Sequence, residues 1–453
     1  MEPAPPAGSY HTDEDEKILH KLGYAQELFR AMGGFQNFAI SFTIISILAG
    51  CLTSYYIAFG QGGPVAVSWG WLLVGGMSII VSLAMAEIAS AFPTAGGLYY
   101  WASKLGSPAW GWFTGWFNLI GQIAVTAAIG YGLATFGTAL LNFWFEYPNT
   151  KEYIYLLYVI FLALALAVNL MKVSFTAFLN TISAYWHIAG VIFIVIVLLF
   201  VPDNHQSLGY VFGETVNASG FGDATMNFSS PIFWYVFATG LLMAQYTITG
   251  FDASAHMAEE TTQASRMLFA FSRDGAVPGH RLWRQVGKNR VPQLSCAAIA
   301  VLSAAVMIPA IWNYLVGYLV GTGIAVIGLY VAFILPVILR FRLGDKFEHG
   351  AWSLGKHYKW IDAIAIIWVA FISILFLLPP YKASIPGTEG WTWEAVNYAP
   401  ILVGGALLLF GGWWVISANK WFKGPVRMGS EEELEQLEQR LEDSSGMHPE
   451  PAA

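Results

Sequence analysis

The chain has 453 residues, of which 56% are hydrophobic and only 11% are charged. Soluble domains carry about 25% charged residues, so this composition excludes an ordinary soluble protein. In a membrane protein the net charge of −7 matters less than the placement of charges on the two faces. The sequence therefore predicts an all-α polytopic membrane protein.

The two ends of the chain differ from the apolar middle. A charged, proline-containing tail precedes the first apolar run, and it is too long and too poorly flanked for a cleaved signal peptide. We predict a tail at residues 1–37, a transmembrane domain at 38–418 and a second tail at 419–453. Cys51 and Cys296 each lie within an apolar run, so neither a disulfide framework nor a thiolate metal site is expected.

Apolar runs long enough to cross a hydrocarbon core of about 30 Å recur along the chain. We predict ten spans, at residues 38–59, 69–91, 109–141, 153–170, 181–201, 232–257, 294–312, 316–339, 361–378 and 401–416. If the amino terminus is cytoplasmic, only Lys151 and Lys382 among the basic residues fall on the outer face. This asymmetry follows the positive-inside rule and predicts that both tails are cytoplasmic.

Two of these runs are interrupted near their middle. The first contains "ISILAGCLTSYY" around Gly50, and the sixth contains "QYTITGFDASAH" around Gly250 and Asp252. Paired interruptions in two halves of a transporter indicate a binding site, because half-helix ends and freed carbonyls there meet charged groups. The alternative is that small residues only let neighbouring helices approach closely. We favour that alternative for Gly50 alone and a functional role for the cluster with the carboxylate.

Ionisable side chains inside a membrane are costly and are functional candidates by default. Asp252 lies deepest, and His187 could exchange a proton near neutral pH, although a structural histidine bonded to a carbonyl is an equal alternative. Glu87 ends the second run and is expected to pair with a basic neighbour, while Glu259 and Glu260 close the sixth run. We therefore treat these three glutamates as gating candidates, with helix capping as the ordinary explanation.

The sequence contains none of the motifs that would indicate an enzyme. We find no Gly-rich phosphate loop, no metal-spaced His and Cys set and no nucleophile elbow. No catalytic residue, metal or other cofactor is therefore predicted, and nucleic acid is not an expected partner.

The chain resembles the amino acid-polyamine-organocation superfamily, specifically its bacterial and fungal amino acid, GABA and choline permease branch. The resemblance rests on "LGYAQELFRAMGGFQNFAISFTIISILAG", "MAEIASAFPTAGGLYYWASKL", "TGFDASAHMAEET", "SRMLFAFSRDGAVPG" and "GLYVAFILPVILR", in the family's order. It implies twelve helices, the first ten forming two inverted five-helix repeats, with substrate held at the broken first and sixth helices. A bacterial inner membrane is the favoured location, and fungal relatives share the motifs.

The resemblance also assigns roles to residues. It implies that an amino acid or related amine binds beside Leu48, Ala49, Gly50, Cys51, Tyr246, Thr247, Thr249, Gly250 and Phe251. His187 falls near a lysine of some proton-coupled relatives, which makes His187 and Asp252 the proton-coupling candidates and proton symport the expected mode of uptake.

One stretch departs from the family pattern. In the relatives, the "EET" that ends the sixth helix precedes a complete seventh helix and an eighth helix that ends in "SRMLFAFSRDGAVPG". Here "EETTQA" passes directly into "SRMLFAF". We therefore predict an internal deletion near residues 261–265, about ten spans, an incomplete second repeat, and a groove bordered by polar and broken-helix backbone that the stub 266–271 is too short to fill.

Two hypotheses for function follow. The first is a secondary active transporter that imports an amino acid or related amine, such as GABA or choline, across the plasma membrane, with protons as the expected coupling ion. The second is a non-transporting deletion product, or a partner subunit that pairs with another protomer, since the missing helices would remove part of the moving bundle and its scaffold.

Overall fold

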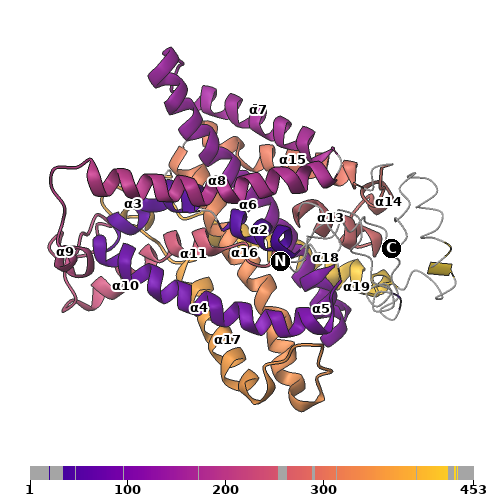
Figure 1. The fold of residues 1–453 in the computed structure, drawn as a ribbon. Helices are drawn as coiled ribbons and strands as arrows, with labels where there is room; N and C mark the ends of the chain where they lie inside the picture. Colours follow the sequence, from indigo (N-terminus) through magenta and orange to yellow (C-terminus); the bar gives the residue numbers. More distant parts are fainter. Residues whose placement is uncertain are drawn as a thin grey trace, which may run out of the picture.

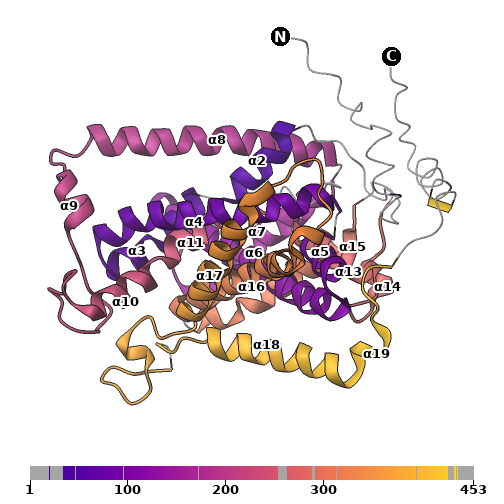
Figure 2. The ribbon, with the colours of Figure 1, turned by 90° about the horizontal axis from the view of Figure 1, so that it is seen from below.

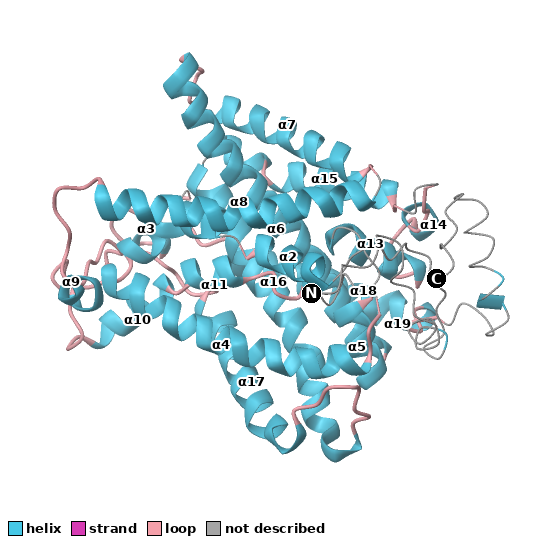
Figure 3. Cartoon of the chain, viewed as in Figure 1, coloured by secondary structure: helices cyan, strands magenta, loops and turns pink. Residues whose placement is uncertain are grey.

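A computed structural model describes residues 34–45, 47–94, 96–171, 173–253, 263–287, 291–312, 314–393 and 395–426, together with four single positions, His20, Glu433, Leu434 and Gln436. Figure 3 shows that these residues are almost entirely helices and loops. Within them, the extended pairing consists of one antiparallel bridge between Gln61 and Asn217. The prediction of an all-α membrane protein is confirmed.

Eight segments of the described chain are long and apolar enough to cross a membrane. They are built on α4 (Pro64–Ala91), α6 (Pro108–Phe145), α7 (Lys151–Asn169), α8 (Val173–Phe200), α15 (Gln293–Val306), α16 (Tyr314–Leu343), α17 (Tyr358–Leu375) and α18 (Ala399–Trp413). The predicted second, third, fourth, fifth and last four spans correspond to these helices in order.

The predicted first and sixth spans are broken into shorter pieces. The first consists of α2 (Gly34–Ile44), a π-helical turn η1 (Ile47–Cys51) and α3 (Leu52–Gly60). The sixth consists of α10 (Pro231–Gly240) and α11 (Leu242–Ile248), after which the backbone of Thr249 is extended. The ten predicted spans therefore divide into eight continuous helices and two interrupted segments.

Shorter helices connect these segments. They are α5 (Gly97–Leu105), α9 (Leu208–Gly213), α13 (Gln263–Arg273), α14 (His280–Trp283) and α19 (Asn419–Trp421), with single turns η3 (Ile308–Ile311), η4 (Gly344–Lys346), η5 (Gly355–His357), η6 (Lys382–Ser384) and η7 (Trp414–Ala418).

The core of the bundle is the crossing of α6 and α16 (Figure 1). Within its most apolar window α16 is 83% buried, against 11% for α8 and 6% for α18. Figure 2 shows α8 and α18 along opposite edges of the molecule. The crossing depends on glycine, because a Cβ at Gly121 would lie only 2.9 Å from the backbone nitrogen of Leu329.

Helix α13 follows the predicted deletion and is longer than the stub expected at residues 266–271. It buries Met267, Phe269 and Phe271 almost completely. The Asp274 carboxylate just after it accepts hydrogen bonds from the Tyr99 hydroxyl at 2.7 Å and from the Val426 amide at 3.1 Å. Helix α13 is thereby fastened to α5 and to the segment that follows the last span.

Candidate functional site

The two interruptions meet face to face. Gly50, in the π-helical turn of the first segment, lies so close to the sixth segment that a Cβ there would approach the Thr247 Cα to 2.9 Å. Real Cβ atoms do not approach backbone so closely, so glycine is required at this position. The geometry brings together the two backbone breaks that the sequence singled out.

A second contact joins the segments at Gly250. Its φ of +119° is a conformation that L-residues rarely adopt, and a Cβ there would overlap the side chain of Ile44. The Ser41 hydroxyl donates to the Phe251 carbonyl at 3.2 Å. Both glycines therefore serve close packing between the segments, so Gly50 fits the packing alternative as well as the functional one.

Hydroxyl groups satisfy the carbonyls at the breaks. The Thr53 and Ser54 hydroxyls both donate to the Gly50 carbonyl. On the sixth segment, Thr247 donates to the Met243 carbonyl and Thr249 to the Gln245 carbonyl, each at 2.7 Å. Because a carbonyl has two lone pairs and hydroxyl rotors turn freely, these carbonyls can be offered to an ammonium group or a cation without moving the backbone.

The remaining predicted binding residues belong to the same two interrupted segments. Leu48 reaches to within 3.3 Å of the Cβ position of Gly190 on α8, and Ala49 and Cys51 complete the π-helical turn. Tyr246 is buried beside Thr247, and the half-buried ring of Phe251 lies 5.3 Å from that of Phe333 on α16, centroid to centroid. All nine predicted binding residues thus belong to the two breaks.

The two proton-coupling candidates lie on different elements. Asp252 is 2% exposed in the turn after Thr249 and acts electrostatically on Tyr330. His187 is buried on α8, where its ring meets Phe42 of α2 edge-on with centroids 5.4 Å apart. The structure therefore associates Asp252 with the sixth segment and α16, and His187 with the first segment.

Sequence reasoning missed a buried polar group beside the junction. Tyr330 of α16 is fully buried, and its hydroxyl interacts electrostatically with the side chains of Ser78, Gln245 and Thr249. Gln245 is itself fully buried within an apolar run, and that would have been the signal, since an amide at that depth needs partners. These residues add a polar wall from α4 and α16 to the site.

The gating candidate Glu87 lies elsewhere on α4. It is nine residues beyond Ser78, or about 14 Å along the helix. The expected basic neighbour is Arg340, whose Nε lies 2.8 Å from the Glu87 carboxylate. Glu87 is fully buried there, four residues before the end of α4. The other gating candidates, Glu259 and Glu260, lie outside the described residues.

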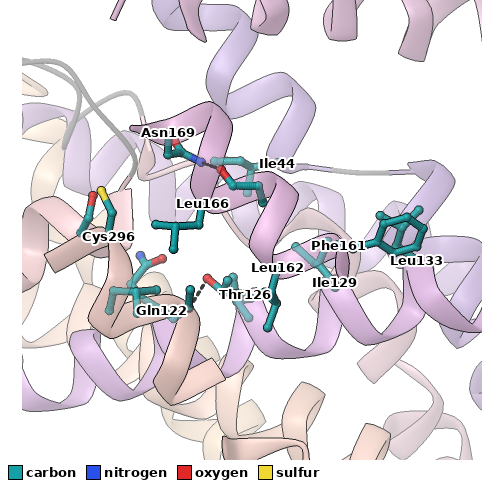
Figure 4. Close-up of a pocket in the computed structure, with 16 residues that line it drawn as sticks. Ile44, Gln122, Thr126, Ile129, Leu133, Phe161, Leu162, Leu166, Asn169 and Cys296 are labelled. Carbon is teal, nitrogen blue, oxygen red and sulfur yellow. Dashed lines mark hydrogen bonds between the residues drawn. The ribbon is translucent and has the colours of Figure 1, made fainter. Parts of the chain in front are cut away.

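A groove of about 360 Å³ opens beside the junction. Its walls are α6, α7 and α15, and Ile44 and Ser265 border it (Figure 4). The expectation that the space left by the deletion is bordered by polar and broken-helix backbone stays a prediction. Most side chains that line this groove are apolar, and its three walls are regular helices whose backbone groups bond internally. Ile44 belongs both to this groove and to the contact with Gly250.

Comparison of the chain with known proteins identifies its family. The amino acid permease family matches the chain in two pieces, residues 32–264 and 261–407. The chain is 33% identical over 515 aligned positions to the amino-acid permease BAT1 homolog of Oryza sativa subsp. japonica. It is 32% identical over 513 aligned positions to amino-acid permease BAT1 of Arabidopsis thaliana. Each alignment covers 91% of this chain and 96% of the relative. Amino-acid permease 2 of Neurospora crassa is 22% identical over 516 positions, covering 92% of this chain and 90% of that protein.

These matches extend over nearly the whole chain and identify a multi-pass membrane protein of a transporter family rather than an enzyme, with an amino acid as the class of substrate. The chain belongs to the amino acid permease family of the amino acid-polyamine-organocation superfamily.

Proposed function

We propose that the protein is a secondary active transporter that imports an amino acid or a related amine, such as GABA or choline, by alternating access around the two broken segments. The observation that carries this proposal is the close approach of the interruptions at Gly50 and Thr247. Freed carbonyls suit an ammonium group, and half-helix amino ends suit a carboxylate. The plasma membrane, with both termini cytoplasmic, is the proposed location.

Protons are the proposed coupling ion, with His187 and Asp252 as candidate carriers. Both are buried ionisable side chains in interrupted or neighbouring segments, where such groups commonly serve proton pathways. Glu87, Glu259 and Glu260 remain gating candidates on the basis of their positions at the ends of spans.

Uptake into liposomes containing the purified chain tests this proposal. We expect accumulation of labelled amino acid that depends on an inward proton gradient and disappears when a protonophore is added. Gly50→Ala should abolish uptake, because its Cβ would collide with Thr247 backbone. Gly404→Ala on α18, where nothing lies within 4 Å, is the matched control. Folded chain in the liposomes without uptake would contradict the proposal for this chain.

The groove supports a second candidate, a deletion product that does not transport by itself. The two family matches meet at residues 261–264, at the predicted deletion, and the BAT1 alignments are longer than the chain of 453 residues. Ser265 directly follows this point and borders the groove. We infer that relatives have a segment here that this chain lacks, and that the groove is the place of its missing helix.

Insertion of the corresponding segment of the Oryza relative between residues 261 and 265 separates the two candidates. If the parent chain is inactive and the completed chain transports, the deletion hypothesis is supported and the family site is intact. Equal transport by both chains would overturn the second candidate. An insertion of equal length made from a Gly and Ser linker controls for chain length alone.

A further inference from the structure

A buried ion pair joins α4 to α16 at the Ala91 end of α4. Arg340 Nε donates to Glu87 Oε2 at 2.8 Å, and neither side chain is exposed to solvent. The guanidinium lies between two aromatic rings, 4.3 Å from the centroid of Phe347 and 4.0 Å from that of Tyr358. Such a sandwich holds the cation without hydration.

The same pair fastens the segment between α16 and α17. The second carboxylate oxygen of Glu87 accepts from the Ser353 hydroxyl at 3.0 Å and from the Leu354 amide at 3.1 Å. Arg340 Nη1 donates to the Gly344 carbonyl at 2.9 Å. Glu87 and Arg340 therefore act together as a latch that holds residues 344–358 against α4, and the Glu87 carboxylate accepts hydrogen bonds from three partners.

A third ionisable side chain lies beside this latch. Asp362 of α17 is completely buried and within electrostatic reach of both Arg340 and Glu87. Neither of its oxygens has a hydrogen-bond partner among the described residues, and the same is true of Arg340 Nη2. An ionised carboxylate in that state is very costly, whereas a protonated carboxyl group is far less so.

The charged side chains around Asp362 do not balance the negative charge that its ionised carboxylate would carry. From α4 it faces Glu87, and from α16 it faces Arg340, which already balances Glu87. In the connecting segment, His349 is half exposed and lies 3.4 Å from Glu87, and Asp345 accepts from the Tyr358 hydroxyl. On α17, Lys359 is exposed and lies over the Tyr358 ring. Two buried acids thus share one buried base.

We propose that Asp362 is a proton-binding site that controls the Glu87–Arg340 latch. With the proton bound, Asp362 is neutral and Arg340 holds Glu87. When the proton leaves to the solvent on the side of residues 344–358, the new carboxylate accepts from Arg340 Nη2 and competes with Glu87 for the cation. The contacts of Glu87 with Ser353 and Leu354 then weaken, and the segment is released.

This inference deepens the proposed function, because a proton bound at Asp362 would belong to the coupling cycle, but protonation can be measured without transport. Infrared difference spectra of the purified full chain should show a buried protonated-carboxyl band that disappears as the pH rises. Asp252 and Asp274 are also buried, so the comparison is made in a background that carries both Asp252→Asn and Asp274→Asn. Asp362→Asn should remove the band, and Asp345→Asn, which changes an exposed acid of the same segment, should keep it.

A band that persists in Asp362→Asn, or an Asp362 carboxyl that stays ionised or stays protonated at every pH tested, would overturn the proposal. The latch has its own readout, hydrogen exchange at the Leu354 amide. After correction for intrinsic exchange, we expect protection of this amide to fall several-fold at alkaline pH in the parent chain and to stay constant in Asp362→Asn. Equal loss in both would contradict control by Asp362. Neither assay needs uptake. A chain that does not transport would therefore contradict the proposed function, while proton binding at Asp362 could still be tested.

Discussion

The two faces of α6 present opposite situations. On one face, Gly121 lets α16 approach until the backbones touch, since a Cβ at Gly328 would lie 3.1 Å from the Gly121 Cα. On the other, Gln122, Thr126 and Ile129 line a groove that nothing else in the described chain fills (Figure 4). Both faces belong to one continuous helix, so the difference lies in the neighbours that the chain supplies. A helix can thus keep its structure with a packed partner on one face and an open groove on the other.

The largest effect is expected on the packed face. Gly121→Val places a branched side chain against the Leu329 backbone, which cannot move aside without shifting α16. We expect a loss of stability of about 3 kcal/mol, as for severe overpacking of a core. Thermal unfolding of the purified chain measures it, with Gly76→Ala on α4 as the control because nothing lies within 4 Å of that Cβ. An unchanged midpoint would show that the crossing is looser than the structure indicates.

The open face should tolerate a larger side chain. Ile129 lines the groove, and Ile129→Phe should change the stability of this chain by no more than about 0.5 kcal/mol. In the chain completed with the relative's segment, the same substitution should cost about 1 to 3 kcal/mol, because the groove would then be occupied. The measurement is the difference between the two unfolding midpoints. If the cost is the same in both chains, the missing helix does not belong in this groove.

The smallest effect concerns the anchor of α13, the helix that begins at the groove. Burial raises the pKa of the Asp274 carboxyl above its ordinary value, although Arg273, Tyr99 and the Val426 amide favour its ionised form. The folded chain therefore holds this proton more tightly than the unfolded chain. The resulting stability is present below the unfolded pKa, about 3.9, and is lost as pH rises through the raised folded pKa.

Asp274→Asn should flatten this part of the dependence of stability on pH. Unfolding midpoints of the two chains, measured from about pH 4 to about pH 8, give the comparison. Asp345→Asn, which changes an exposed carboxylate, should leave the slope unchanged. A slope that is as steep in Asp274→Asn as in the parent chain would place its origin in another group.

The sequence predicted features that depend on local pattern. Apolar runs located the spans, and small residues around Gly50 and Gly250 located the two breaks. Features that depend on three-dimensional contacts were not predicted from the sequence. Tyr330 looks like an ordinary aromatic residue in an apolar run until α4 and the sixth segment meet it. The apolar groove was not predicted either, because it forms where α15 packs against α6 and α7, which lie far from α15 in the sequence.

Asp362 lies between these cases. It stands in the second position of a predicted span, where the rule that membrane-buried acids are functional candidates would have selected it. What the sequence could not supply is its distance in the fold from Glu87, 275 positions earlier, because that proximity arises only when α4, α16 and α17 pack together.

The hydroxyl groups that donate to the Gly50 carbonyl affect how fast a ligand can bind there and leave. Thr53 and Ser54 already occupy this carbonyl within the first segment, so a ligand that needs it displaces hydroxyl protons and leaves the backbone in place. Rotation of a hydroxyl group breaks no backbone hydrogen bond, whereas a helix that has to re-form relaxes in about 0.1 to 1 μs. Binding and release at this carbonyl would therefore be limited by access to the junction, and the broken helix would be ready for the next ligand as soon as the previous one departs.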